Sequence, residues 1–195
     1  MDAIELLKQQ HREVEELFSK IEKAEQPAQK ASLFHELATK LVGHDAIERE
    51  IFYPACEDAM GLNDELGEAL VEHGVVEFSL YQADQAVGQQ DFDFKVTVLK
   101  ELVKHHVEEE EKEFLPKAKK ALGDEELEEL GEEMLDAFEE ASNEDYHAPL
   151  FENLRQVLAG TLKPISREER EEDEEDEEDE RPSTKRKTAH ARKTA

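Results

Sequence analysis

Four stretches of the chain carry apolar residues at helical spacing, and each stripe is interrupted near its middle by a histidine. Alternating steps of three and four residues are typical of one face of an amphipathic helix. The stripes are Ile4, Leu7, His11, Val14, Phe18 and Ile21; Leu37, Leu41, His44, Glu48 and Ile51; Leu66, Leu70, His73, Glu77 and Leu80; and Leu99, Val103, His106, Glu110 and Phe114. The pattern therefore predicts four helices whose inward faces are polar at mid-length.

Three of these stripes place a glutamate four residues after the histidine, one turn further along the same face. These are Glu48, Glu77 and Glu110. Burying an unpaired carboxylate costs several kcal/mol, so three of them need a shared compensating charge. Metal cations supply it, and imidazole and carboxylate are both suitable ligands. A satisfied core histidine, or a hydrogen-bonded histidine–glutamate pair, would explain one helix. The same polar interruption of the apolar stripe in four helices favours a metal site.

The fourth stretch leaves a choice between two adjacent histidines, His105 and His106, because each has a glutamate four residues later. Comparison with the second stretch favours His106. When HDAIEREIFYP is aligned with HVEEEEKEFLP on the final proline, His106 matches His44 and Glu110 matches Glu48. His105 and Glu109 would then lie about 100° round the helix, although they also form a plausible inward row with Leu102.

Proline, glycine and polar breaks divide the sequence into predicted helices at about 2–25, 28–52, 63–87 and 92–114, followed by shorter segments at about 124–141 and 149–158. Pro27, Pro54 and Pro116 are expected to end the first, second and fourth helices. Short connections between long helices favour antiparallel neighbours. The expected fold is all-α, an up-down antiparallel four-helix bundle with an extra C-terminal helical segment beside or capping it.

The charge balance excludes several classes of function. The chain has 52 acidic and 24 basic residues, so we expect no nucleic-acid binding by its body and no binding to an anionic membrane surface. No apolar run approaches the ~20 residues that span a bilayer. The only cysteine, Cys56, permits no intrachain disulfide, and the N-terminus does not resemble a signal peptide. A cytoplasmic location is expected.

The composition changes sharply near residue 164. Glu171 to Glu180 is a run of ten carboxylates, and residues 181–195 then carry six basic residues and no acidic one. Such a run repels itself and buries no apolar surface, so it should be disordered. We expect a metal-binding domain over residues 1–160 and a disordered, acidic-then-basic tail over residues 161–195.

The sequence resembles the hemerythrin-like, or HHE cation-binding, domain family. The resemblance spans about residues 5–118 and is carried by QQHREVEELF around His11, HDAIEREIFYP around His44, EHGVVEF around His73 and HHVEEEEKEFLP around His106. It implies an up-down bundle that encloses two iron ions, bridged by oxo or hydroxo. It further implies that these four histidines are terminal ligands and that Glu48 and Glu110 bridge the two irons.

The chain departs from the oxygen-carrying members at two places. Those proteins carry a second histidine on the third helix where this chain has Glu77, and their fourth-helix carboxylate is one residue further from its histidine. Simple reversible oxygen transport is therefore not expected. The expected role is to bind, sense or handle dioxygen, nitric oxide, peroxide or iron at one open coordination position, with Glu77 as a further candidate ligand. Manganese and zinc are less favoured than iron.

Two other functions compete with this interpretation. A ferritin-like oxidase or storage protein would need E-x-x-H motifs on two helices, and the chain has a single one, Glu144 to His147, outside the predicted core. A metal-free helical interaction module would need no ligands, and its protein partner is unknown. No Gly-rich phosphate loop or nucleophile motif points to an enzyme with an organic substrate.

Overall fold

The computed structural model describes residues 1–159, and every regular element in that range is helical. The elements are α1 (Ala3–Lys23), α2 (Pro27–Ile47), η1 (Glu48–Phe52), α3 (Tyr53–Met60), α4 (Asp64–Asp84), α5 (Phe92–Glu109), η2 (Glu110–Phe114), α6 (Leu115–Ser142) and α7 (His147–Ala159). The all-α class is thereby confirmed. The expectations about the tail and the boundary near residue 160 lie outside the described residues.

Local capping explains where two of the predicted helices begin. The Asp2 carboxylate accepts a hydrogen bond from the Glu5 amide at 2.8 Å, at the start of α1. At the start of α4, the Asn63 side chain accepts from the Leu66 amide at 3.0 Å. Each cap satisfies a backbone N–H that has no partner within the helix.

The prediction that Pro54 and Pro116 end their helices is wrong. Each proline lies in the first turn of a new α-helix that continues the old one through a wider π-helical turn, η1 or η2. In these turns the Tyr53 amide donates to the Glu48 carbonyl, and the Leu115 amide donates to the Glu110 carbonyl. A proline ring collides with the carbonyl four residues earlier in a regular α-helix. The wider turn relieves that conflict, so the helix continues.

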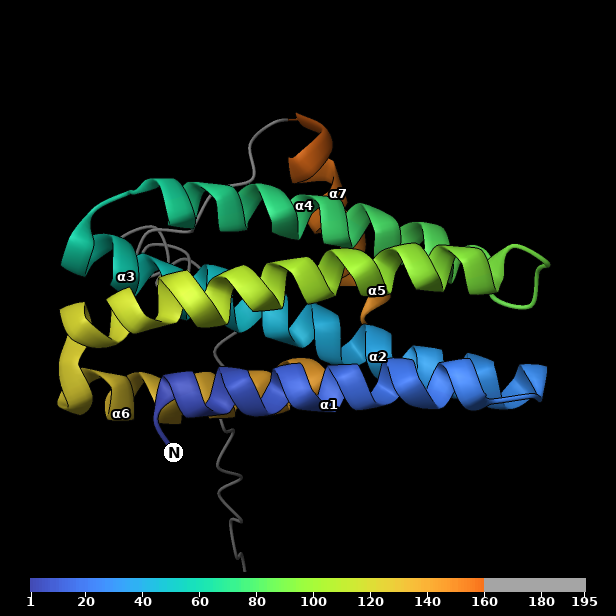
Figure 1. The fold of residues 1–195 in the computed structure, drawn as a ribbon, viewed down its shortest axis with the longest axis horizontal. Coiled ribbons are helices and arrows are strands. Elements are labelled where there is room, and N and C mark those ends of the chain that lie inside the picture. Colours follow the sequence, from blue (N-terminus) through green and yellow to red (C-terminus); the bar gives the residue numbers. More distant parts are fainter. Residues whose placement is uncertain (160–195) are drawn as a thin grey trace, which may run out of the picture. The chain divides into compact units, whose positions relative to one another are not determined.

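The predicted segment at 124–141 is the second half of α6. The helix bends at Gly123, whose φ of 81° is a conformation that glycine adopts without steric cost. After the bend, α6 continues to Ser142, and it packs against α1 and α2. Figure 1 shows α6 alongside α1, and α7 packs against α4. The extra C-terminal helices therefore lie beside the helices that carry the histidines.

The core consists of two apolar clusters separated by a polar layer. The first contains Leu7, Ile47, Leu66 and Phe114, and the second contains residues such as Val14. Helices α1, α2 and α4 each contribute to both clusters, and α5 does so together with η2, which follows it. Each histidine falls where the chain passes from one cluster to the other. In Figure 1 these helices, α1, α2, α4 and α5, lie side by side. The fold thus places the histidines of the four stripes in one polar layer.

Among residues 1–159, no helix is long and apolar enough to cross a bilayer.

We predict that Gly131→Ala destabilises the chain. An added Cβ would lie 2.8 Å from the Ala3 amide nitrogen and closer still to the Met1 carbonyl oxygen, so backbone would have to move. A loss of about 1–3 kcal/mol in the free energy of unfolding is expected from such overpacking. Gly67→Ala is the matched control, because nothing lies within 4 Å of its added Cβ. It should stabilise α4 by about 0.5–1 kcal/mol. Urea denaturation measures both, and equal effects would contradict the packing argument.

Candidate metal centre

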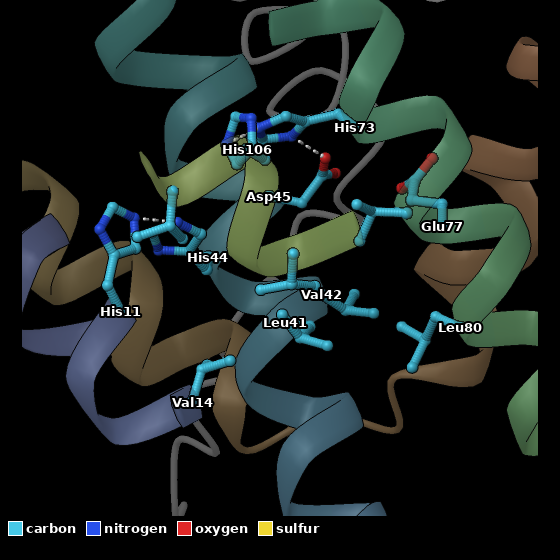
Figure 2. A pocket seen from close by; sticks show the side chains of 13 residues that line it. His11, Val14, Leu41, Val42, His44, Asp45, His73, Glu77, Leu80 and His106 are labelled. Carbon is cyan, nitrogen blue, oxygen red and sulfur yellow. Dashed lines mark hydrogen bonds and ion pairs between the residues drawn. The ribbon is translucent and has the colours of Figure 1, made fainter. Parts of the chain in front are cut away.

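The four histidines meet in the polar layer as two pairs. His11 of α1 faces His44 of α2, with 3.2 Å between their Nε2 atoms. His73 of α4 faces His106 of α5, with 3.0 Å between their Nε2 atoms. All four side chains are buried. Figure 2 shows both pairs among the side chains that line a cavity. The structure therefore brings together all four histidines that the sequence singled out.

Two glutamates, Glu48 and Glu110, lie between the pairs. Glu48 Oε2 is 3.2 Å from the Nε2 atoms of both His44 and His73. Glu110 Oε2 is 3.3 Å from His11 Nε2. Each glutamate is the first residue of a π-helical turn, a distortion that is frequent at functional sites.

Five residues form two sets of donor atoms that could each hold a cation, and the sets share Glu48. Within each set the atoms lie within 4.8 Å of one another. The sets are His11, His44 and Glu48, and Glu48, His73 and His106. Both oxygens of Glu48 and Oε2 of Glu110 are buried without a hydrogen-bond partner. Such orphaned acceptors are rare in folded proteins, and a cation pair would satisfy them.

Each histidine is oriented by an oxygen atom outside the pair. The acceptors and their distances from Nδ1 are Glu111 Oε1 at 2.9 Å for His11, Gln10 Oε1 at 2.7 Å for His44, Asp45 Oδ1 at 2.6 Å for His73 and Glu72 Oε2 at 3.0 Å for His106. Since Nδ1 donates outward, Nε2 is the atom left for a cation. Sequence analysis missed these four residues, because only tertiary packing brings them to the rings.

The electrostatics of the metal-free layer place protons on one histidine of each pair. Burial opposes protonation, yet hydrogen bonds to Glu110 and Glu111 raise the pKa of His11 to about 9. The pKa of His73 is raised well above its ordinary value by Asp45 and Glu48, again against burial. These two imidazolium groups balance carboxylates such as Glu110, whereas burial and the Glu110 charge raise the pKa of Glu48 to about 8, so Glu48 is largely protonated at neutral pH.

The other member of each pair stays neutral. Burial and the charge of His11 hold the pKa of His44 well below its ordinary value, and burial and His73 lower that of His106. Each pair therefore holds one protonated and one neutral ring. A cation that binds between them must displace that proton, so binding would release protons.

Tyr53 is a further buried group that the sequence analysis did not single out. Its Oη is 3.0 Å from His73 Nε2 and 3.4 Å from Glu110 Oε1. Burial and the charge of Glu48 raise its pKa well above the ordinary value, so the phenol stays protonated. Its position within the motif FYP, one residue after the π-helical turn, was the available signal.

Glu77, also a predicted ligand, is not in either donor set. Its carboxylate accepts a hydrogen bond from Asn153 of α7, beside Asp45. Burial and the Asp45 charge raise the pKa of Glu77 to about 9, so it is protonated at neutral pH. In Figure 2, Asp45 and Glu77 both border the cavity, with Glu77 away from the histidine pairs. The structure therefore separates Glu77 from the five residues of the donor sets and from Glu110.

The remaining histidines of residues 1–159 lie outside the centre. The His105 side chain is 63% exposed, whereas His106 is buried within its pair. This matches the orientation that the alignment of the two proline motifs predicted. His35 is exposed, and its ring contacts Tyr146. The His147 side chain is 40% exposed and lies beside Asp84. The single cysteine, Cys56, is a buried core residue.

An apolar cavity of about 40 Å³ adjoins the two histidine pairs. Besides the histidines, Asp45 and Glu77, it is lined by Val14, Leu41, Val42, Val76, Leu80, Val103 and Val107. Val14, Leu41, Val42 and Leu80 are labelled below the histidines in Figure 2. A water molecule needs roughly 10–15 Å³ by this measure, so the cavity holds molecules of two or three heavy atoms.

The two halves of the site repeat along the chain. His73, His106 and Glu110 each lie 62 residues after His11, His44 and Glu48 respectively. The acceptor Glu72 likewise lies 62 residues after Gln10. The π-helical turns η1 and η2 are separated by the same interval. Equivalent segments of α1–η1 and α4–η2 thus supply equivalent ligand positions.

Comparison with known proteins agrees with this arrangement. The sequence profile of the hemerythrin HHE cation binding domain matches residues 2–118, which include every predicted ligand. A crystal structure of a hemerythrin HHE cation binding domain-containing protein from Mycobacterium kansasii is similar, with 27% sequence identity and a TM-score of 0.67. The match covers 79% of this chain and 99% of that chain. No curated protein matches significantly.

We predict that His106→Ala removes bound metal and that His105→Ala does not. His106 Nε2 points at His73, whereas His105 is mostly outside the centre. Both variants remove one imidazole from α5, so each controls for the other. Metal per chain after gel filtration measures the difference, and circular dichroism checks the fold. If His105→Ala empties the site while His106→Ala leaves it full, the assignment of the inward row is wrong.

Proposed function

The chain belongs to the hemerythrin HHE cation-binding domain family, and from this premise we propose that it is a non-haem di-iron protein that binds, senses or handles a small ligand. The family binds metal cations, and two donor sets of histidine and glutamate fit that chemistry. The proposal includes the identity of the metal, the role of each ligand and the class of molecule that is bound.

The four histidines are the proposed terminal ligands, with His11 and His44 on one iron and the other pair on the second. Glu48 is the proposed first bridge, because it belongs to both donor sets. Glu110 is the proposed second bridge, because its two oxygens approach His11 on one side and Tyr53, beside His73, on the other. The four Nδ1 acceptors would fix the rings and raise the basicity of Nε2.

Iron is proposed over manganese or zinc because the family resemblance points to a di-iron centre. Imidazole and carboxylate ligands by themselves suit all three metals. Bound iron would supply a redox-active centre with a position open to a small ligand. The chain's own residues would hold the ions, orient the ligand rings and exclude bulk water.

The cavity is the single observation that carries the proposed ligand class. Its volume of about 40 Å³ suits dioxygen, nitric oxide or peroxide and is too small for an ordinary organic substrate. Its walls are apolar apart from the histidines, Asp45 and Glu77. An apolar wall favours a weakly polar diatomic molecule over water.

We also propose the up-down arrangement of the four histidine-bearing helices. Along the chain, α1 passes from the first apolar cluster to the second, α2 returns, α4 passes to the second again, and α5 with η2 returns. Because successive helices pass between the two clusters in opposite orders, this pattern supports helices that run in alternating directions. We further propose that residues 1–160 form one metal-binding domain.

We predict two transition-metal ions per chain, mostly iron, in protein isolated without chelators. The reason is the two adjacent donor sets, which are too extended for one ion. Inductively coupled plasma mass spectrometry gives both the metal and the stoichiometry, so manganese or zinc would be recognised. Much less than one transition-metal ion per chain would favour the metal-free interaction module instead.

We predict that Val103→Phe lowers nitric oxide affinity by roughly tenfold or more without lowering iron content. Val103 lines the cavity, so a phenyl ring would fill it. Val96→Phe is the matched control on the same helix, because Val96 is equally buried but does not line the cavity. Nitric oxide titration followed by absorbance measures affinity. Equal nitric oxide binding in both variants at full iron content would exclude the cavity as the ligand site.

A further inference from the structure

A second group of potential metal ligands lies on the outer surface of α4 and α5. His105 Nε2 is 3.3 Å from Glu72 Oε1 and 3.6 Å from Glu109 Oε1. One donor atom from each residue lies within 4.8 Å of the others, as in the buried sets. Glu72 is half-buried, and the other two are exposed. We call Glu72, His105 and Glu109 the outer triad.

The outer triad is connected to the buried centre through Glu72. While Oε1 faces His105, the other oxygen, Oε2, accepts a hydrogen bond from His106 Nδ1 at 3.0 Å. One carboxylate therefore contacts both an exposed histidine and a proposed iron ligand. A cation at the outer triad would be separated from the His106 ring by a single side chain.

An acidic pocket of about 30 Å³ leads inward beside this contact. It is lined by Glu65, Glu68, Glu72, Glu109, Glu110 and Glu113, with Ala69, His106 and Phe114. At its inner end, Glu110 is only 2% exposed, and its Oε2 has no hydrogen-bond partner. A buried carboxylate at the end of a carboxylate-lined pocket indicates a path for a cation.

The acidic pocket also opens to the surface. Glu68, Glu72 and Glu109 line both this pocket and a broad hollow of about 760 Å³ outside it, which His105 also lines. The outer triad stands where the hollow and the pocket meet. This route differs from the apolar cavity, which shares only His106 with the pocket.

We propose that the outer triad captures a divalent cation and passes it through the acidic pocket to His106 and Glu110. This inference rests on the proposed metal centre and adds the route by which the centre is filled. Clustered carboxylates raise the local concentration of cations and focus their approach. Mixed nitrogen and oxygen ligands suit Fe²⁺. Because two of its members are exposed, the outer triad should bind weakly, which suits transfer rather than storage.

The proposal predicts a change in rate without a change in final occupancy. The test uses the full-length chain stripped of metal and Co²⁺ as the probe, with uptake followed by stopped-flow absorbance. His105→Ala/Glu109→Gln should slow uptake by on the order of tenfold and still reach the wild-type Co²⁺ content. Release of Co²⁺ to a chelator should slow by the same factor, because a path lowers the barrier in both directions.

His35→Ala/Glu108→Gln is the matched control. It removes one exposed imidazole and one exposed carboxylate, and it changes the charge equally, but neither residue lines the acidic pocket or the hollow. It should load at the wild-type rate. Slowing in both double variants would indicate a general charge effect and overturn the route.

Three further outcomes are decisive. Wild-type rates in His105→Ala/Glu109→Gln, with full occupancy, would overturn the route and leave the metal centre standing. A lower final Co²⁺ content in that variant would overturn transfer, because the triad would then be part of the holding site. Failure of the wild-type chain to take up Co²⁺ would overturn the metal centre and the route together.

Discussion

The structure depends on how two buried carboxylates, Glu48 and Glu110, are kept from carrying unbalanced charge. They lie between two apolar clusters that offer no compensation, and their oxygens approach histidine nitrogens within 3.3 Å. Without cations, protons on His11 and His73 and on Glu48 itself supply the balance. Either form of compensation requires four helices to present their side chains at one level. The packing of the apolar clusters is what maintains that level.

The sequence predicted those features that follow from the position of a residue on its own helix. A histidine in an apolar stripe must be buried with the stripe, so the pattern around His11, His44, His73 and His106 indicated both the helices and the layer. The matched spacing to Pro54 and Pro116 distinguished His106 from His105 for the same reason. These inferences needed only helical geometry and the free energy of burying polar groups.

The features that the sequence did not predict arise from contacts between helices. Asp45 and Glu72 accept hydrogen bonds from rings on other helices, so no spacing within one helix reveals them. Glu77 has the spacing of a ligand, but Asn153 of α7 holds it beside Asp45. Pro54 looked like a helix end, because a π-helical turn that accommodates a proline has no simple sequence pattern. For Asp45, Glu72 and Glu77 a partner distant in sequence decides the outcome, whereas for Pro54 the local turn does.

The 62-residue repeat gives the centre an approximate internal twofold symmetry, and single residues break it. Tyr53 approaches His73, whereas the equivalent position in the second repeat is Leu115, which has no hydroxyl. Asp45, which holds the His73 ring, is matched by Val107. The two halves are therefore alike in their inner ligands and unlike in their surroundings. Two ions bound here would be chemically inequivalent, with separate affinities and reduction potentials, so that the chain could fill or oxidise one position before the other.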